Sequence, residues 1–142
     1  MKPLAGTLAS LMNQAIPATE NFDAVVPVPL YWRRQWRRGF NQAELLAREV
    51  AKRRGIPVLN ALRRKRGTEI QAGLANAGRR RNVAGAFAVD SKARLDGKRI
   101  LLIDDVMTTG ATASACASAL KRGGAKSISL LTVARVDRRS RF

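Results

Sequence analysis

Hydrophobic positions along this chain change between a helical and a strand-like spacing. Apolar residues recur three or four positions apart in three segments, which predicts helices at 3–16, 41–54 and 113–122. Five short apolar runs have the length and composition of buried strands, at 24–29, 58–62, 86–89, 100–103 and 127–134. Strands that alternate with helices in this order predict an α/β fold, with an open, mainly parallel sheet and flanking helices.

The predicted helices also carry end signals and apolar stripes. Asn41 stands where the second helix begins, with Glu44 three residues later, and this pair fits a capping box. Glu44 also lies four residues before Arg48, the spacing of an ion pair on a helix surface. Gly55 follows as the residue that ends this helix. The first helix is expected to bury Leu4, Leu8, Leu11, Met12 and Ala15. The last helix is expected to bury Ala113, Cys116, Ala117 and Leu120.

One long segment, 63–85, follows neither pattern. It is rich in Arg, Lys and Gly and holds few large apolar residues. A stretch of this length without regular structure inside a compact domain is usually functional or disordered. We therefore predict a mobile loop, or a partly ordered hood over the sheet.

The composition limits the class of protein. With 142 residues, 46% of them hydrophobic, the chain is long enough for one domain with a real core and too apolar to be disordered. No apolar run approaches the ~20 residues of a membrane span, and the N-terminus lacks the pattern of a signal peptide. Cys116 is the only cysteine and His is absent, which excludes intrachain disulfides, cysteine zinc sites and His-dependent triads. These features predict a cytoplasmic protein without a membrane partner.

The charge of the chain is strongly unbalanced. There are 27 Lys and Arg residues against 10 Asp and Glu residues, a net charge of +17. Such a field attracts polyanions, and nucleic acid, nucleotides and diphosphates are all candidates. A generally basic surface without a dedicated ligand is the alternative, and charge alone leaves both open.

The most specific chemistry in the sequence follows the strand predicted at 100–103. Asp104 and Asp105 come directly after it, and a turn of small and hydroxyl residues then opens the last helix. Backbone N–H groups at the start of a helix have no partner within the helix and can receive a phosphate. The two acids can accept hydrogen bonds from ribose hydroxyls or position Mg²⁺, which prefers oxygen ligands. The turn consists of Thr108, Thr109, Gly110, Ala111 and Thr112.

This arrangement predicts a sugar-phosphate site, because ligands of open α/β sheets bind at the carboxyl ends of the strands. A Rossmann-like turn with a purely structural role is the alternative. The order, spacing and strand–turn–helix context resemble the phosphoribosyl-diphosphate (PRPP) loop of type I phosphoribosyltransferases. In that loop the two acids bind the ribose 2′- and 3′-hydroxyls and the threonine turn binds the 5′-phosphate.

Further segments extend the resemblance over about residues 3–135. They are similar to the ComF family, the competence-protein branch of the phosphoribosyltransferase fold that also includes GntX-like proteins. The Arg-Gly-Phe-Asn-Gln run is distinctive when it precedes an Asp-Asp loop. The segments that carry the resemblance are 26–30, 38–46, 71 with 74, 80–83 and 85–87.

The resemblance implies a type I phosphoribosyltransferase-like domain that binds PRPP and Mg²⁺ and transfers the phosphoribosyl group to an unknown acceptor. Asp104 and Asp105 would be the catalytic residues, acting by positioning and electrostatics, and would also hold Mg²⁺. Candidates for the diphosphate are Arg34, Arg37 and Arg38, whose guanidinium groups suit phosphate oxygens. The flexible catalytic loop of related enzymes corresponds to Arg80, Arg81 and Asn82. The family also links the chain to competence and DNA uptake.

The sequence departs from the family pattern at two places. Many members carry an N-terminal four-cysteine zinc module that this sequence lacks, so residues 1–142 are expected to form a single phosphoribosyltransferase-like domain. In addition, Trp32 and Trp36 stand among arginines. They suggest an alternative function, a single-stranded DNA-binding competence factor that retains a non-catalytic PRPP site. A hood helix with both tryptophans packed inward explains the same pattern without DNA.

Overall fold

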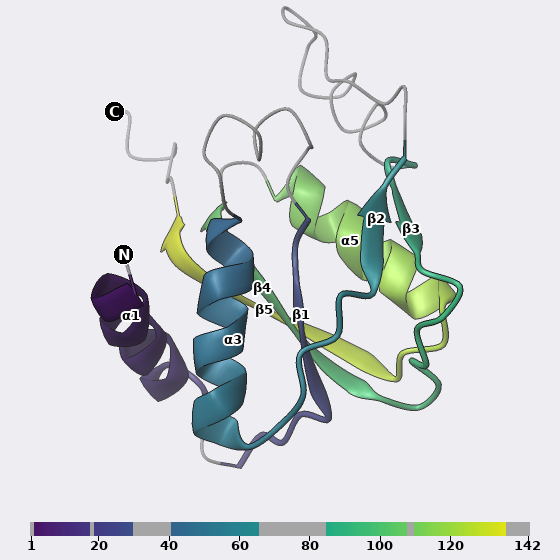
Figure 1. Ribbon diagram of the computed structural model, residues 1–142. Helices are drawn as coiled ribbons and strands as arrows, with labels where there is room; N and C mark the ends of the chain where they lie inside the picture. The colour runs from purple at the N-terminus through teal and green to yellow at the C-terminus, as the bar shows by residue number, and fades with distance from the viewer. Residues whose placement is uncertain (1, 18, 30–40, 66–84, 108–109, 136–142) are drawn as a thin grey trace, which may run out of the picture.

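Parallel strands covered by helices make up the body of the molecule (Figure 1). The structure, a computed structural model, describes residues 2–17, 19–29, 41–65, 85–107 and 110–135. The helices are α1 (Lys2–Gln14), α3 (Gln42–Arg54) and α5 (Ala111–Arg122). The strands are β1 (Ala24–Pro27), β2 (Leu62–Arg64), β3 (Phe87–Val89), β4 (Arg99–Met107) and β5 (Ser127–Arg135). None of these helices is long and apolar enough to cross a membrane.

The main sheet has the strand order β1-β4-β5, and both of its strand pairs are parallel. β4 lies in the centre, where Leu101 is in register with Val25 of β1 and Ile103 with Leu131 of β5. The open, parallel sheet with flanking helices that the sequence pattern predicts is therefore confirmed. β4 is the predicted central strand, and it continues four residues beyond the predicted end at Ile103.

Side chains of β4 alternate between two hydrophobic clusters, one on each face of the sheet. Leu101 and Ile103 pack with residues of α1 and α3, among them Leu46. Leu102 packs on the other face with Leu120 of α5 and with residues of β2 and β3. Figure 1 shows the same layers, with α1 and α3 over one face and α5 with the β2–β3 hairpin over the other. Because successive side chains of β4 point to opposite faces of the sheet, this one strand packs against both layers.

The strand predicted at 58–62 is displaced along the chain. Val58 forms a single parallel bridge to Val25, and the Leu59 N–H donates to the Val25 carbonyl over 2.8 Å. The chain then leaves the edge of the main sheet and forms β2, which pairs antiparallel with β3. The prediction was wrong because apolar spacing alone does not show which partner a short segment pairs with.

Two of the predicted apolar stripes are also shifted. Leu11 is 59% exposed, and the small Ala9, which is fully buried, takes its place in the cluster between α1 and α3. In α5, Ala115 and Ala119 are buried whereas Ala117 is half-buried. In both helices an alanine faces the neighbouring element, and a small side chain there allows closer packing than a large one.

The predicted ends of α3 are confirmed. The Asn41 side chain accepts a hydrogen bond from the Ala43 N–H over 3.1 Å, as an N-cap does. Gly55 has a φ of 67°, in the left-handed region, and its N–H donates to carbonyls of the last turn. The surface pair of Glu44 and Arg48 is present at 2.7 Å. The two ends of α3 are therefore determined by residues that are close to them in the sequence.

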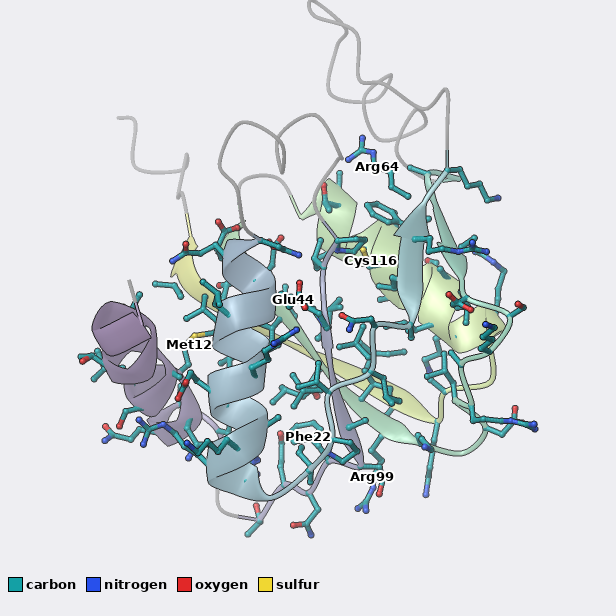
Figure 2. All side chains as sticks on the ribbon, in the orientation of Figure 1. Met12, Phe22, Glu44, Arg64, Arg99 and Cys116 are labelled. Atoms are coloured by element: carbon teal, nitrogen blue, oxygen red, sulfur yellow. The ribbon has the colours of Figure 1, made fainter. Side chains whose placement is uncertain are left out.

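An aspartate and an arginine are joined at the amino edge of the main sheet. The Arg99 N–H donates to Asp23 Oδ2 over 2.8 Å, and the Arg99 guanidinium donates to both carboxylate oxygens, at 3.1 and 3.2 Å. This pairing holds the pKa of Asp23 below its usual value, at about 2. Figure 2 shows Arg99 at this edge, at the end of the sheet away from Arg64 and Cys116.

Candidate functional site

The carboxyl edge of the sheet is where β1, β4 and the start of α3 meet. The Val28 N–H donates to the Ile103 carbonyl over 2.9 Å, which extends the pairing of β1 with β4 past the end of β1. The Asn41 side chain donates to the Val28 carbonyl over 3.3 Å. Asn41 therefore both caps α3 and ties its first turn to β1, so three elements are fixed around the end of the central strand.

Asp104 and Asp105 lie in the second half of β4 and are both half-buried. The Asp105 N–H donates to Asp104 Oδ1 over 2.9 Å. The two carboxyl groups are also close enough for a hydrogen bond and mutual repulsion to act on Asp104. The two acids thus form a pair at the edge of the sheet where the sequence motif predicts a ligand.

The pKa of Asp104 is raised to about 7, from an ordinary value of 3.8. Burial is the main cause, and the hydrogen bond and negative charge of Asp105 add to it. No basic side chain of the described residues contributes to this pKa. A ligand that brings hydroxyl donors or a cation to this carboxyl would therefore stabilise its ionised form.

The turn after β4 opens α5 at the same edge. Gly110 has a φ of 81° and occupies the N-cap position of α5 without a side-chain cap, and its carbonyl accepts from the Ser114 N–H over 2.9 Å. Ala111 and Thr112 belong to the first turn, which holds no acidic residue. A helix start without an acid is compatible with an anion, because the helix dipole favours negative charge there. Thr108 and Thr109 lie outside the described residues.

The remaining predicted site residues also lie outside the described residues. The residues expected to bind the diphosphate belong to the segment 30–40. Its neighbours in the sequence, Pro29 and Asn41, are described at the carboxyl edge. The residues expected in the flexible loop belong to the segment 66–84. The chain on either side of that segment is joined by a hydrogen bond of 2.7 Å from the Lys65 N–H to the Ala86 carbonyl. The two sets are Arg34, Arg37 and Arg38, and Arg80, Arg81 and Asn82.

Two residues toward this end of the sheet, Cys116 and Arg64, were not expected near the site from the sequence. Cys116 of α5 is buried, and burial together with the negative charge of Asp104 raises the pKa of its thiol to about 12. Arg64, at the end of β2, partly opposes this shift, and its guanidinium lies 5.6 Å from the centre of the Phe87 ring. Figure 2 shows Arg64 and Cys116 toward the same end of the molecule. Arg64 was assigned to an irregular segment, so no sequence signal placed it near this site.

The donor set of the acid pair fits Mg²⁺. This cation is usually held by one or two carboxylates together with water and substrate phosphates, rather than by a full cage of protein ligands. The described residues contain no cluster of three or more His, Cys, Asp or Glu side chains. Asp104 and Asp105 would therefore hold such an ion together with a phosphorylated ligand, and not alone.

Comparison with known proteins identifies the fold. Residues 4–141 match the phosphoribosyl transferase domain family. The chain is 41% identical over 115 residues to competence protein F of Haemophilus influenzae, covering 80% of this chain and 50% of that protein. It is 37% identical over 139 residues to the DNA utilization protein YhgH of Salmonella typhi, covering 93% of this chain and 60% of that protein.

Solved structures show the same fold. The glutamine PRPP amidotransferase of B. subtilis, solved with ADP and GMP, superposes with a TM-score of 0.63 at 20% identity, over 93% of this chain and 26% of that chain. At this identity the likeness concerns the fold alone. The chain spans about half the length of the curated relatives it matches.

Proposed function

Since the chain belongs to the phosphoribosyl transferase domain family, and within it to the ComF family, we propose that it binds PRPP at the carboxyl edge of its sheet. The observation that carries this proposal is the acid pair of Asp104 and Asp105 at the end of the central strand, next to the helix start at Gly110. In this arrangement one strand–turn–helix unit can bind sugar hydroxyls at the end of its strand and a phosphate at the start of its helix.

In the proposed complex, the carboxylates of Asp104 and Asp105 accept hydrogen bonds from the ribose 2′- and 3′-hydroxyls. These donors favour the ionised form of Asp104, whose pKa is raised to about 7 in their absence. The 5′-phosphate receives N–H groups and hydroxyls from the turn Thr108, Thr109, Gly110, Ala111 and Thr112. When bound, Mg²⁺ would neutralise part of the charge of the diphosphate.

We propose phosphoribosyl transfer as the reaction. The bond between ribose C1 and the diphosphate oxygen breaks, diphosphate leaves with the electron pair, and C1 forms a bond to the acceptor. Positive charge develops on the ribose, so Asp104 and Asp105 act by holding the ring and by stabilising this charge. Arg34, Arg37 and Arg38 would hold the departing diphosphate, and the loop of Arg80, Arg81 and Asn82 would exclude water.

Calorimetric titration with PRPP and Mg²⁺ tests the site. Wild type is expected to bind, and Asp104→Asn/Asp105→Asn is expected to lose binding. The matched control is Asp90→Asn/Asp96→Asn, which makes the same chemical change outside the site and is expected to bind as wild type does. Absence of binding by wild type, or equal binding by the site variant, would end the proposal.

A second candidate is a role in handling DNA. The matched relatives are named competence protein F and DNA utilization protein, and the net charge of +17 suits a polyanion. In this alternative the chain binds single-stranded DNA and keeps the PRPP site without catalysis. Trp32 and Trp36 with their neighbouring arginines are the sequence candidates for stacking bases, and they lie outside the described residues.

Binding of single-stranded DNA over a salt series tests the second candidate. The logarithm of the binding constant is expected to fall linearly with the logarithm of the salt concentration. A smaller slope in Trp36→Ala/Arg37→Ala would support the tryptophan segment as the contact. Binding by neither wild type nor variant would remove this candidate. For both candidates we propose a cytoplasmic location, which suits the lone, buried thiol of Cys116.

A further inference from the structure

Two turns lie side by side at the amino edge of the sheet, away from the acid pair. One is the 90–98 segment between β3 and β4, and the other consists of the last two residues of α5, Lys121 and Arg122, with the 123–126 turn that precedes β5. The Gly97 N–H donates to the Gly124 carbonyl over 3.0 Å, and the Lys126 N–H donates to the Lys98 carbonyl over 2.8 Å. These bonds join the two turns into one surface, here called the basic end surface.

The basic end surface concentrates positive charge. Its two turns hold six basic side chains against the two acids Asp90 and Asp96. Five of the six basic residues are exposed and Lys98 is half-buried. The basic residues are Lys92, Arg94, Lys98, Lys121, Arg122 and Lys126.

These positive charges are only partly neutralised within the part of the chain that the structure describes. None of the five exposed basic side chains makes a hydrogen bond or ion pair there, whereas the Asp90 carboxylate accepts from the Lys92 N–H and faces Arg63 at 4.0 Å. The basic residues of α3 differ: Arg48 pairs with Glu44, and Arg54 donates to Asn13. The surface therefore keeps a net positive charge, because Asp90 and Asp96 offset only two of its six basic side chains.

The helix dipole explains only part of this pattern. Lys121 and Arg122 occupy the last turn of α5, where basic residues are favoured in any helix. Arg94, Lys98 and Lys126 come from other segments and gain nothing from that dipole. Convergence of basic residues from two turns on one surface thus calls for another explanation.

A cavity of about 240 Å³ adjoins this surface. Its walls come from the hairpin and α5, with Phe87, Val89 and Ala119 among them, and it is also lined by Lys65 and Arg122. Arg122 belongs to both the cavity and the basic end surface. An apolar hollow beside a row of cations suits a ligand with flat apolar groups along a charged backbone.

We propose that the basic end surface binds the sugar–phosphate backbone of nucleic acid. The proposal rests on the second candidate function and gives it a location other than the tryptophan segment. α5 runs from the proposed phosphate site at Ala111 to Arg122, and its length at ~1.5 Å per residue separates the two sites by roughly 17 Å. One chain can therefore hold nucleic acid and PRPP at the same time, on opposite edges of one sheet.

Charge-neutral variants at matched positions test this assignment. Lys121→Gln/Lys126→Gln removes two exposed charges from the basic end surface, and Arg48→Gln/Lys52→Gln removes two exposed charges from α3, on the opposite face of the sheet. Anisotropy is measured with a labelled single-stranded oligodeoxynucleotide, its duplex and the ribo-oligonucleotide of the same sequence, between roughly 50 and 200 mM salt. Thermal unfolding of each variant confirms that it is folded.

For single strands, each phosphate contact contributes about 0.7 to the salt slope, so loss of two contacts should reduce the slope by about 1.4 and weaken binding about twentyfold at roughly 0.1 M salt. The α3 variant should stay within about twofold of wild type. Whichever probe wild type binds most tightly identifies DNA or RNA as the source of the backbone. PRPP titration should be unchanged in both variants.

Four outcomes would overturn the assignment. Equal losses in the two variants would show general polycation behaviour. Binding lost only in Trp36→Ala/Arg37→Ala would keep the DNA function but move its site. Equally tight binding of polyglutamate would show that the surface accepts any polyanion. Absence of nucleic-acid binding by wild type would remove the second candidate function as well, whereas failed PRPP binding would affect neither.

Discussion

Asp23 and Asp104 lie at opposite edges of one sheet, and their environments shift their pKa values in opposite directions. Asp23 receives three hydrogen bonds from Arg99, which lower its pKa to about 2. Asp104 is desolvated beside a second acid, Asp105, which raises its pKa to about 7. The first carboxylate has its partner built into the fold. The second has a neighbour of like charge, an arrangement common at functional sites.

Such a difference is expected between an acid with a structural role and an acid that binds a ligand. A carboxylate that is paired with arginine raises the free energy of unfolding, because its ionised form is stabilised in the native state. Two adjacent, half-buried acids lower the free energy of unfolding when both are ionised, and destabilising arrangements of this kind are expected at functional sites. Removal of Asp23 should therefore affect stability and leave binding intact, and removal of the acid pair should do the reverse.

The largest effect is expected from the double variant Asp104→Asn/Asp105→Asn. Loss of charge-assisted hydrogen bonds to the ribose should weaken PRPP binding about 100-fold or more. The free energy of unfolding near neutral pH should be equal to or above that of wild type, because an amide avoids the cost of burying a charge. Calorimetry and denaturant unfolding measure the two quantities. A large loss of stability with unchanged binding would show that the pair is structural.

Gly110→Ala is expected to have the next largest effect, at the same edge. The φ of 81° at this position costs a residue with a Cβ about 1–2 kcal/mol, which should appear as reduced stability. The start of α5 should also shift, so PRPP affinity should fall. Gly85→Ala is the matched control, since a Cβ there meets no atom within 4 Å and its φ is not positive. Equal stability of both variants would contradict the proposed strain.

Local signals allowed part of this edge to be predicted from sequence. Asn41 and Gly55 act through their own backbone and the adjacent turn, so their roles as helix ends follow from residue type and spacing. The position of the acids after an apolar run likewise placed them at the carboxyl edge. The PRPP-binding roles of these residues remain predictions from the motif.

Contacts between distant segments could not be predicted in this way. The charge of Arg64 acts on the pKa of the Cys116 thiol, and the position of Arg64 depends on the pairing of β2 with β3, a partner more than twenty residues further along the chain. The exposure of Leu11 depends on which face of α1 meets α3. The raised pKa of Asp104 depends on burial by several elements. Each of these properties belongs to the packed structure, and apolar spacing along the chain does not contain it.

Substitution of Asn41 should have a smaller effect than that of Gly110. Asn41→Ala removes the cap of α3 and should lower stability by about 1 kcal/mol. Asn41→Asp keeps an oxygen that accepts from the Ala43 N–H but cannot donate to the Val28 carbonyl, so it separates the cap from the tie to β1. Denaturant unfolding should place Asn41→Asp between wild type and Asn41→Ala. An Asp variant as unstable as the Ala variant would show that the tie to β1, and not the cap, stabilises this edge.

The smallest effect is expected from Asp23→Asn, because the ion pair with Arg99 is exposed to solvent and such pairs contribute little. Its signature is the dependence on pH. The pKa of Asp23 is about 2 in the folded protein and 3.8 in the ordinary carboxyl, so the unfolded chain binds the proton first as the pH falls. The stabilisation is thus complete above pH 3.8 and is lost between that value and about 2.

Asp23→Asn should be less stable than wild type near neutral pH and should approach the stability of wild type below this pH window. Glu20→Gln, an exposed change nearby, should follow the wild-type curve. If the stability of wild type and of Asp23→Asn changed with pH in parallel, Arg99 would not stabilise the ionised form of Asp23. The contrast between Asp23 and Asp104 would then be wrong.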